Sequence, residues 1–99
     1  MEFDIARNDS YLVVKVAGRL DAQTAPALQD GMGEALEGID EITFDLGELE
    51  FISSAGLRIL LASYKLMSKR EGGMQIENAT GDVMGVLEMS GFASLFDVQ

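Results

Sequence analysis

The sequence predicts an α/β fold in which a mixed β-sheet of about five strands carries its α-helices mainly on one side. Three observations predict it. Strand-like and helix-like segments alternate in the order β-β-α-β-α-β-α-β, a turn at residues 8–10 joins the first two strands, and the early strands are apolar on one face. The short turn implies a leading antiparallel hairpin, and the later alternation implies parallel crossovers.

Alternation of apolar and polar residues marks the strands. The expected strands are residues 3–6, 11–18, 39–47, 74–78 and 94–98. The residues expected to face the core in the two clearest strands are Leu12, Val14, Val16, Ile42, Phe44 and Leu46. Gly18 ends or bulges the second strand. Residues 48–51 are expected to bridge the third strand to the next helix.

The first helix is expected to begin after Thr24 as its N-cap, with Pro26 tolerated in the first turn and Gly38 as its stop. Gly31 and Gly33 lie inside it, and each costs about 1 kcal/mol relative to alanine. Either packing holds this helix, or another part of the chain approaches it closely.

Two further helices complete the pattern. One begins at a serine pair, residues 53–54, and ends at residues 72–73; it is apolar over most of its circumference and should pack along the sheet. The other is capped by Thr80 and stopped by Gly91.

Composition limits the function. We expect a single domain over residues 1–99, with 47% hydrophobic residues for its core. Seventeen acidic against seven basic residues give a charge of −10, which disfavours nucleic acid and membrane insertion and favours a protein partner with a basic surface. The lack of cysteine and of a signal peptide predicts a cytoplasmic protein.

The absence of histidine and cysteine disfavours an enzyme. The chain cannot form a Ser-His triad, a thiolate or a zinc site with the usual ligands. We therefore expect no catalytic residue, no metal and no cofactor. The basic cluster at residues 65–70 is expected to complement the dipole of a helix C-terminus.

The serine pair has two interpretations. A serine before a helix is a favoured N-cap, because its hydroxyl accepts a backbone N–H that has no partner in the helix. A serine at the end of a parallel strand and the start of a helix also lies where α/β proteins bind ligands, and the helix dipole there favours an anion such as a phosphate. Gly56 is explained by close approach of the first helical turn to its neighbours.

Residues 18–28, 42–65 and 72–96 resemble the STAS domain of bacterial anti-sigma factor antagonists, in the right order and spacing over essentially the whole chain. The resemblance is most specific over residues 45–57. It implies a STAS-like fold, here lacking the usual C-terminal helix because the chain stops at Gln99. It also implies a binding protein that captures an anti-sigma factor serine kinase and so releases a sigma factor. That kinase inactivates it by phosphorylation of one serine, and a PP2C-type phosphatase restores it.

Carried over by position, the resemblance places the phosphorylated serine at Ser54. Ser53 stands where aspartate is common and is assigned mainly to capping, and Ala55 stands where Ser or Thr is common. The residues implied to bind the partner are Gly18, Asp21, Thr24, Ser53, Ser54, Gly56 and Leu57. A solvated or capping role for Asp21 is the alternative.

Two other functions remain open. One keeps the fold without a serine switch, as a STAS subunit of a transporter or another regulatory complex. The other is an aspartate phospho-acceptor of the response-regulator receiver type. The second is disfavoured because Asp45 does not end its strand cleanly and no lysine follows Lys69.

Overall fold

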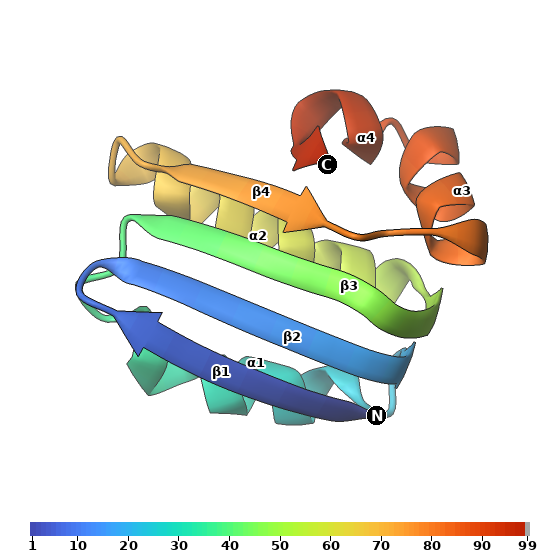
Figure 1. Ribbon diagram of the computed structural model, residues 1–99, viewed down its shortest axis with the longest axis horizontal. Coiled ribbons are helices and arrows are strands. Elements are labelled where there is room, and N and C mark those ends of the chain that lie inside the picture. The colour runs from blue at the N-terminus through green and yellow to red at the C-terminus, as the bar shows by residue number, and fades with distance from the viewer. Residues whose placement is uncertain (99) are drawn as a thin grey trace.

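The computed structural model describes residues 1–98 and forms one five-stranded sheet in the order β1-β2-β3-β4-β5 (Figure 1). Strand β1 is antiparallel to β2, and the other neighbouring pairs are parallel. The strands are β1 (Glu2–Asn8), β2 (Tyr11–Leu20), β3 (Glu41–Ile52), β4 (Gly73–Glu77) and β5 (Asp97–Val98). The helices are α1 (Ala25–Gly33), the 3-10 helix η1 (Glu34–Leu36), α2 (Ser54–Lys69), α3 (Gly81–Met89) and α4 (Phe92–Leu95). The expected mixed sheet and leading hairpin are therefore confirmed.

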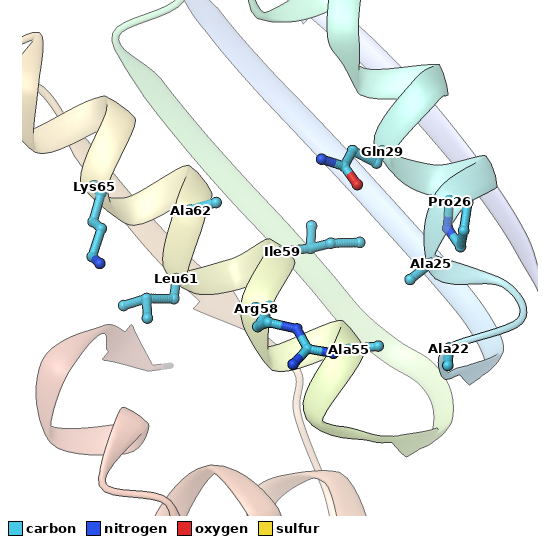
Figure 2. Close-up of a pocket in the computed structure, with 10 residues that line it drawn as sticks. All are labelled: Ala22, Ala25, Pro26, Gln29, Ala55, Arg58, Ile59, Leu61, Ala62 and Lys65. Atoms are coloured by element: carbon cyan, nitrogen blue, oxygen red, sulfur yellow. The ribbon is translucent and has the colours of Figure 1, made fainter.

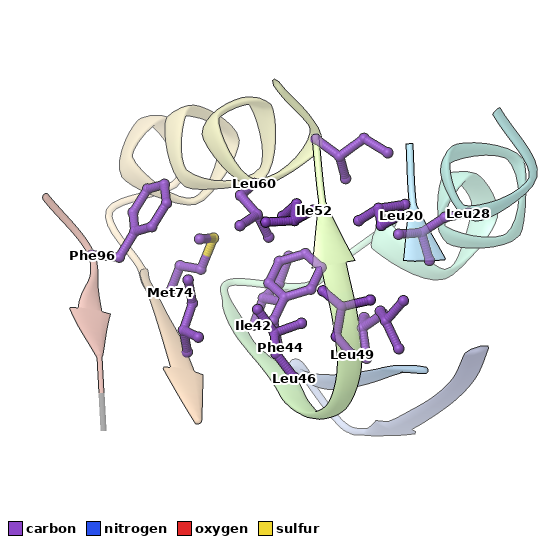
Figure 3. Packing of buried hydrophobic residues seen from close by; sticks show 14 of the residues in the cluster. Leu20, Leu28, Ile42, Phe44, Leu46, Leu49, Ile52, Leu60, Met74 and Phe96 are labelled. Carbon is purple, nitrogen blue, oxygen red and sulfur yellow. The ribbon is translucent and has the colours of Figure 1, made fainter. Parts of the chain in front are cut away.

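One face of the sheet carries the core. The six residues predicted to face inward from β2 and β3 are all at most 1% exposed. Because side chains alternate across a strand, they point to one side, where α1 and α2 cover them (Figures 1 and 3). Figure 3 shows Leu28 of α1 beside Leu20 of β2, and Leu60 of α2 on the same side of the sheet as Phe44. The one-sided placement of these two helices is confirmed.

The opposite face of the sheet is polar, and in the described chain neither α1 nor α2 covers it (Figure 1). Tyr11, Thr43 and Gln75 lie on three adjacent strands there. The Tyr11 and Thr43 hydroxyls are hydrogen bonded, and Gln75 Nε2 donates to both, at 3.1 Å and 3.0 Å. This network satisfies the Thr43 hydroxyl, which is only 2% exposed.

Two predicted boundaries are wrong. Residues 48–51 belong to β3 and are not a bridge, because β-bulges shift the register of β3 against β2 and let the strand continue to Ile52. The segment 94–98 is mostly helical or irregular, and only residues 97–98 form β5. Helix α4 there brings Phe96 against the Tyr64 ring, with 5.4 Å between ring centroids. The expectation about a C-terminal helix concerns Gln99 and beyond, outside the described residues.

The glycines inside the helices have different surroundings. A Cβ on Gly31 would lie 2.6 Å from the Phe3 ring of β1, so here another part of the chain does approach the helix closely. Nothing lies within 4 Å of the corresponding position at Gly33. The expected close approach at Gly56 is also confirmed, because a Cβ there would lie 2.6 Å from Ile52 Cγ1 and 2.9 Å from Leu20.

Gly56→Ala should therefore lower the free energy of unfolding by about 1–3 kcal/mol, since the added methyl group overpacks the junction of α2 with the sheet. The measurement is urea-induced unfolding. Gly33→Ala is the matched control, and it should leave stability unchanged or raise it by up to about 1 kcal/mol. Equal effects of the two substitutions would show that the junction at Gly56 can relax freely.

Candidate functional site

The candidate site lies where β2 and β3 end side by side. The two strands are parallel, Leu20 pairs with Ile52, and the Ser53 N–H donates to the Leu20 carbonyl at 2.9 Å. The loop after β2 and the start of α2 therefore meet at one edge of the sheet, as parallel strand ends do. This pairing brings the predicted residues Asp21 and Thr24 beside the serine pair.

Ser53 is the N-cap of α2. Its backbone is extended, with φ −100° and ψ −178°, and its Oγ accepts a hydrogen bond from the Ala55 N–H at 3.3 Å. It thereby satisfies one of the N–H groups that a helix start leaves without a partner. The predicted capping role of Ser53 is confirmed.

Ser54 is the first residue of α2, and its side chain is exposed. No hydrogen bond or ion pair joins its hydroxyl to another residue in the described chain, and α2, which Ser54 begins, is 16 residues long. The hydroxyl is thus accessible at the positive end of a long helix dipole. Such a position tolerates an added anion better than the middle of a helix would.

The loop at residues 21–24 is held by its own side chains. Asp21 Oδ1 accepts hydrogen bonds from the N–H groups of Gln23 at 3.0 Å and Thr24 at 3.2 Å. Thr24 Oγ1 donates to the Arg19 carbonyl at 2.9 Å and accepts from the Asp21 N–H at 2.9 Å. Thr24 is the N-cap residue of α1 by position, but its side chain makes no capping hydrogen bond. That part of the prediction is wrong, because the hydroxyl is used to close the loop.

The Asp21 carboxylate is stabilised in its charged form. Desolvation opposes ionisation, but hydrogen bonds from the Gln23 and Thr24 N–H groups and the Thr24 hydroxyl outweigh it, helped by the Arg19 charge. The pKa of Asp21 therefore lies below its ordinary value. Within the loop Asp21 therefore acts as a capping residue, as the alternative interpretation expected. Its part in partner binding stays a prediction.

Asp21→Asn should flatten the dependence of stability on pH. The stabilisation from a carboxylate with a lowered pKa is fully present above the ordinary aspartate pKa of about 3.9, and is lost as the pH falls through the lower pKa of the folded state. Urea unfolding at a series of pH values from about 5 to 2 measures this loss. Thr24→Ser, which keeps the hydroxyl, is the control and should retain the wild-type dependence. An unchanged slope in Asp21→Asn would contradict the assignment.

The other residues predicted to bind the partner, Gly18, Gly56 and Leu57, lie close to the serine pair and are partly or fully buried. Gly56 lies in the first turn of α2 and is buried, and Leu57 next to it is half-buried against the core. Gly18 has φ +86° at a register shift between β2 and β3, a backbone conformation that favours glycine. Their contribution to partner binding stays a prediction.

The sequence interpretation missed three residues at this edge. The Arg19 guanidinium lies 4.2 Å from the centroid of the Phe51 ring, and its Nε lies 4.0 Å from Asp21 Oδ2. Arg58 lies one helical turn after Ser54 and lines a groove beside α2 (Figure 2). The sequence pattern places Phe51 in a bridge and not in β3, where it pairs with Arg19. The contact between the Arg19 guanidinium and the Phe51 ring therefore could not be predicted.

The described residues form neither a metal-binding cluster nor a membrane-spanning helix. Residues 1–98 contain no group of three or more Asp or Glu side chains arranged to hold a metal ion. Among the same residues, no helix has both the length and the apolar character needed to cross a bilayer.

Comparison with curated proteins finds relatives along nearly the whole chain. An anti-sigma F factor antagonist of Paenibacillus polymyxa is 27% identical over 100 residues, which cover 99% of this chain and 86% of that protein. An anti-sigma-B factor antagonist of Bacillus subtilis is 22% identical over 95 residues, which cover 96% and 87%.

Comparison with solved structures finds the same fold. An anti-sigma factor antagonist from Mycobacterium paratuberculosis superposes with a TM-score of 0.84 at 29% identity, covering 98% of this chain and 83% of that one. The Bacillus cell fate determinant SpoIIAA in its phosphorylated form superposes with a TM-score of 0.78 at 17% identity, covering 99% and 91%. The family described as "Mlab, STAS domain" matches residues 3–97. With this match and the sheet order described above, the chain belongs to the STAS domain family.

Proposed function

We propose that this protein is an anti-sigma factor antagonist, a binding module that captures an anti-sigma factor serine kinase and is switched off by phosphorylation of Ser54. The observation that carries the proposal is the exposed Ser54 hydroxyl at the first position of α2, beside the loop held by Asp21 and Thr24. The names of the relatives, anti-sigma F and anti-sigma-B factor antagonists, support the same class of partner.

The chemistry of the switch is a phosphoryl transfer. The Ser54 Oγ attacks the γ-phosphorus of ATP bound to the kinase, the hydroxyl proton leaves, and ADP departs. A phosphoserine carries about −1.5 to −2 charges at pH 7. The N–H groups and dipole of the α2 N-terminus stabilise this charge within the protein, so the fold is kept while the docking surface becomes strongly anionic. A PP2C-type phosphatase restores the surface by hydrolysing the phosphate ester.

The direct test incubates this protein with ATP and an anti-sigma factor serine kinase from the same organism. Mass spectrometry should find one added phosphoryl group, on Ser54, and none in Ser54→Ala. Ser53→Ala is the matched control, and it should still be phosphorylated at Ser54. No phosphoryl transfer, with the kinase shown to be active, would favour a STAS subunit of another complex in which Ser54 only begins the helix.

A further inference from the structure

A groove separates α1 from α2 on the helical side of the sheet. Ten residues line it, with a volume of about 620 Å³: Ala22, Ala25, Pro26, Gln29, Ala55, Arg58, Ile59, Leu61, Ala62 and Lys65. Figure 2 shows Ile59 of α2 and Gln29 of α1 projecting into the gap between the two helices. A smaller hollow of about 120 Å³ continues it toward Met32, Leu36 and Leu66. Small side chains along both walls leave room for larger ones from outside.

The groove carries positive charge on a protein whose net charge is −10. Four of the seven basic residues are already engaged by carboxylates or backbone carbonyls: Arg7, Lys15, Arg19 and Arg70. The other three lie on α2 and form no ion pair or hydrogen bond with a described side chain or carbonyl: Arg58, Lys65 and Lys69. Two of these three, Arg58 and Lys65, line the groove.

The spacing of the two cations matches an α-helix. Arg58 and Lys65 are seven residues apart, which is two turns and about 10.5 Å along α2. A helix lying beside α2 would present acidic side chains to both if they too were seven residues apart. Its apolar residues at intermediate positions would fill the alanine-lined gap, as amphipathic helices do in grooves of this kind.

We propose that the groove between α1 and α2 is a docking site for an amphipathic α-helix of a protein partner, with acidic residues seven positions apart on the edge of its apolar face. The extent of the groove favours a helix over a small anion, because the α2 residues that line it run from Ala55 to Lys65, about 15 Å, and a small molecule would cover only part of that length. Phosphorylation of Ser54 would place negative charge one helical turn from Arg58, so the site is proposed for the unphosphorylated protein.

The test titrates the isotopically labelled, unphosphorylated protein with a synthetic peptide of about five helical turns. The peptide has leucines on one face and two glutamates seven residues apart. We expect saturable binding, with the largest amide shift changes in the groove residues. Arg58→Glu combined with Lys65→Glu should weaken binding about tenfold. A peptide with lysines in place of the two glutamates should bind this double variant better than the wild-type protein.

Lys69→Glu is the control for a charge reversal on the same helix outside the residues that line the groove, and it changes the net charge by −2, half the change in the double variant. It should change the affinity by less than about twofold. Three results would overturn the proposal: no saturable binding up to about 1 mM peptide, shift changes centred on the polar face of the sheet, or an equal loss of affinity in Lys69→Glu. The phosphorylation assay uses neither this peptide nor these variants. A lack of peptide binding would therefore contradict the docking site alone and would not affect the proposed phosphorylation of Ser54.

Discussion

Ser54→Asp should weaken binding of the cognate anti-sigma factor about a hundredfold if Ser54 is the switch of this protein. The exposed side chain at the start of α2 would then place a negative charge on the docking surface. Opposed by one anionic group about 5 Å away, at an effective dielectric constant of about 20, that charge costs roughly 3 kcal/mol. This corresponds to about a hundredfold in the dissociation constant, which isothermal calorimetry or surface plasmon resonance measures.

The loss of binding should occur without loss of stability. An aspartate at the first position of a helix is stabilised by the dipole by about 0.3–1 kcal/mol, and Arg58 lies four residues further on. Ser54→Ala should bind as the wild type does, and Ser68→Asp, an exposed position at the other end of α2, controls for the added net charge. Equal affinities of Ser54→Asp and Ser54→Ala would rule out an electrostatic switch at this residue.

Gly72→Ala should lower the free energy of unfolding by about 3 kcal/mol. A Cβ on Gly72 would lie 1.7 Å from the Asp40 carbonyl oxygen, which is backbone and cannot rotate away as a side chain can. The same carbonyl accepts a hydrogen bond from the Gly73 N–H at 2.9 Å, and Glu41 pairs with Gly73. Relief of the clash must therefore displace the starts of β3 and β4 together.

Gly85→Ala is the control for Gly72→Ala. Gly85 lies in α3 with no other atom within 4 Å of the added methyl group, so the substitution should raise stability by up to about 1 kcal/mol through helix propensity. Urea-induced unfolding of both variants measures the difference. If both changed stability by the same amount, the approach of residue 72 to the Asp40 carbonyl would be looser than the structure has it.

Sequence patterns correctly predicted the features that residues close together in the chain determine. The inward faces of β2 and β3 followed from period-two alternation, since burial of one face of a strand imposes that period. The cap by Ser53 followed from its position before an apolar helix. Both rest on residues close together in the chain.

The predictions for the end of β3 and for the Thr24 side chain were wrong, because contacts between segments distant in the sequence determine both. The buried residues Leu46, Leu49 and Ile52 are spaced by three, because bulges between β2 and β3 interrupt the alternation. The alternation in the sequence therefore ends at Gly47, and the pattern predicts a bridge where the structure has the end of β3. The hydroxyl of Thr24 was expected to cap α1, but it bonds the Arg19 carbonyl of the preceding strand instead.

The order of the main strands and helices, the buried faces of β2 and β3 and the place of the serine pair at a helix start could be predicted from the sequence alone. These properties depend on hydrophobic period and capping, which neighbouring residues set. The contact of the Arg19 guanidinium with the Phe51 ring and the groove between α1 and α2, edged by Arg58 and Lys65, emerged from the three-dimensional structure. Both depend on strand register and on the separation of two helices across a sheet, which no local pattern encodes.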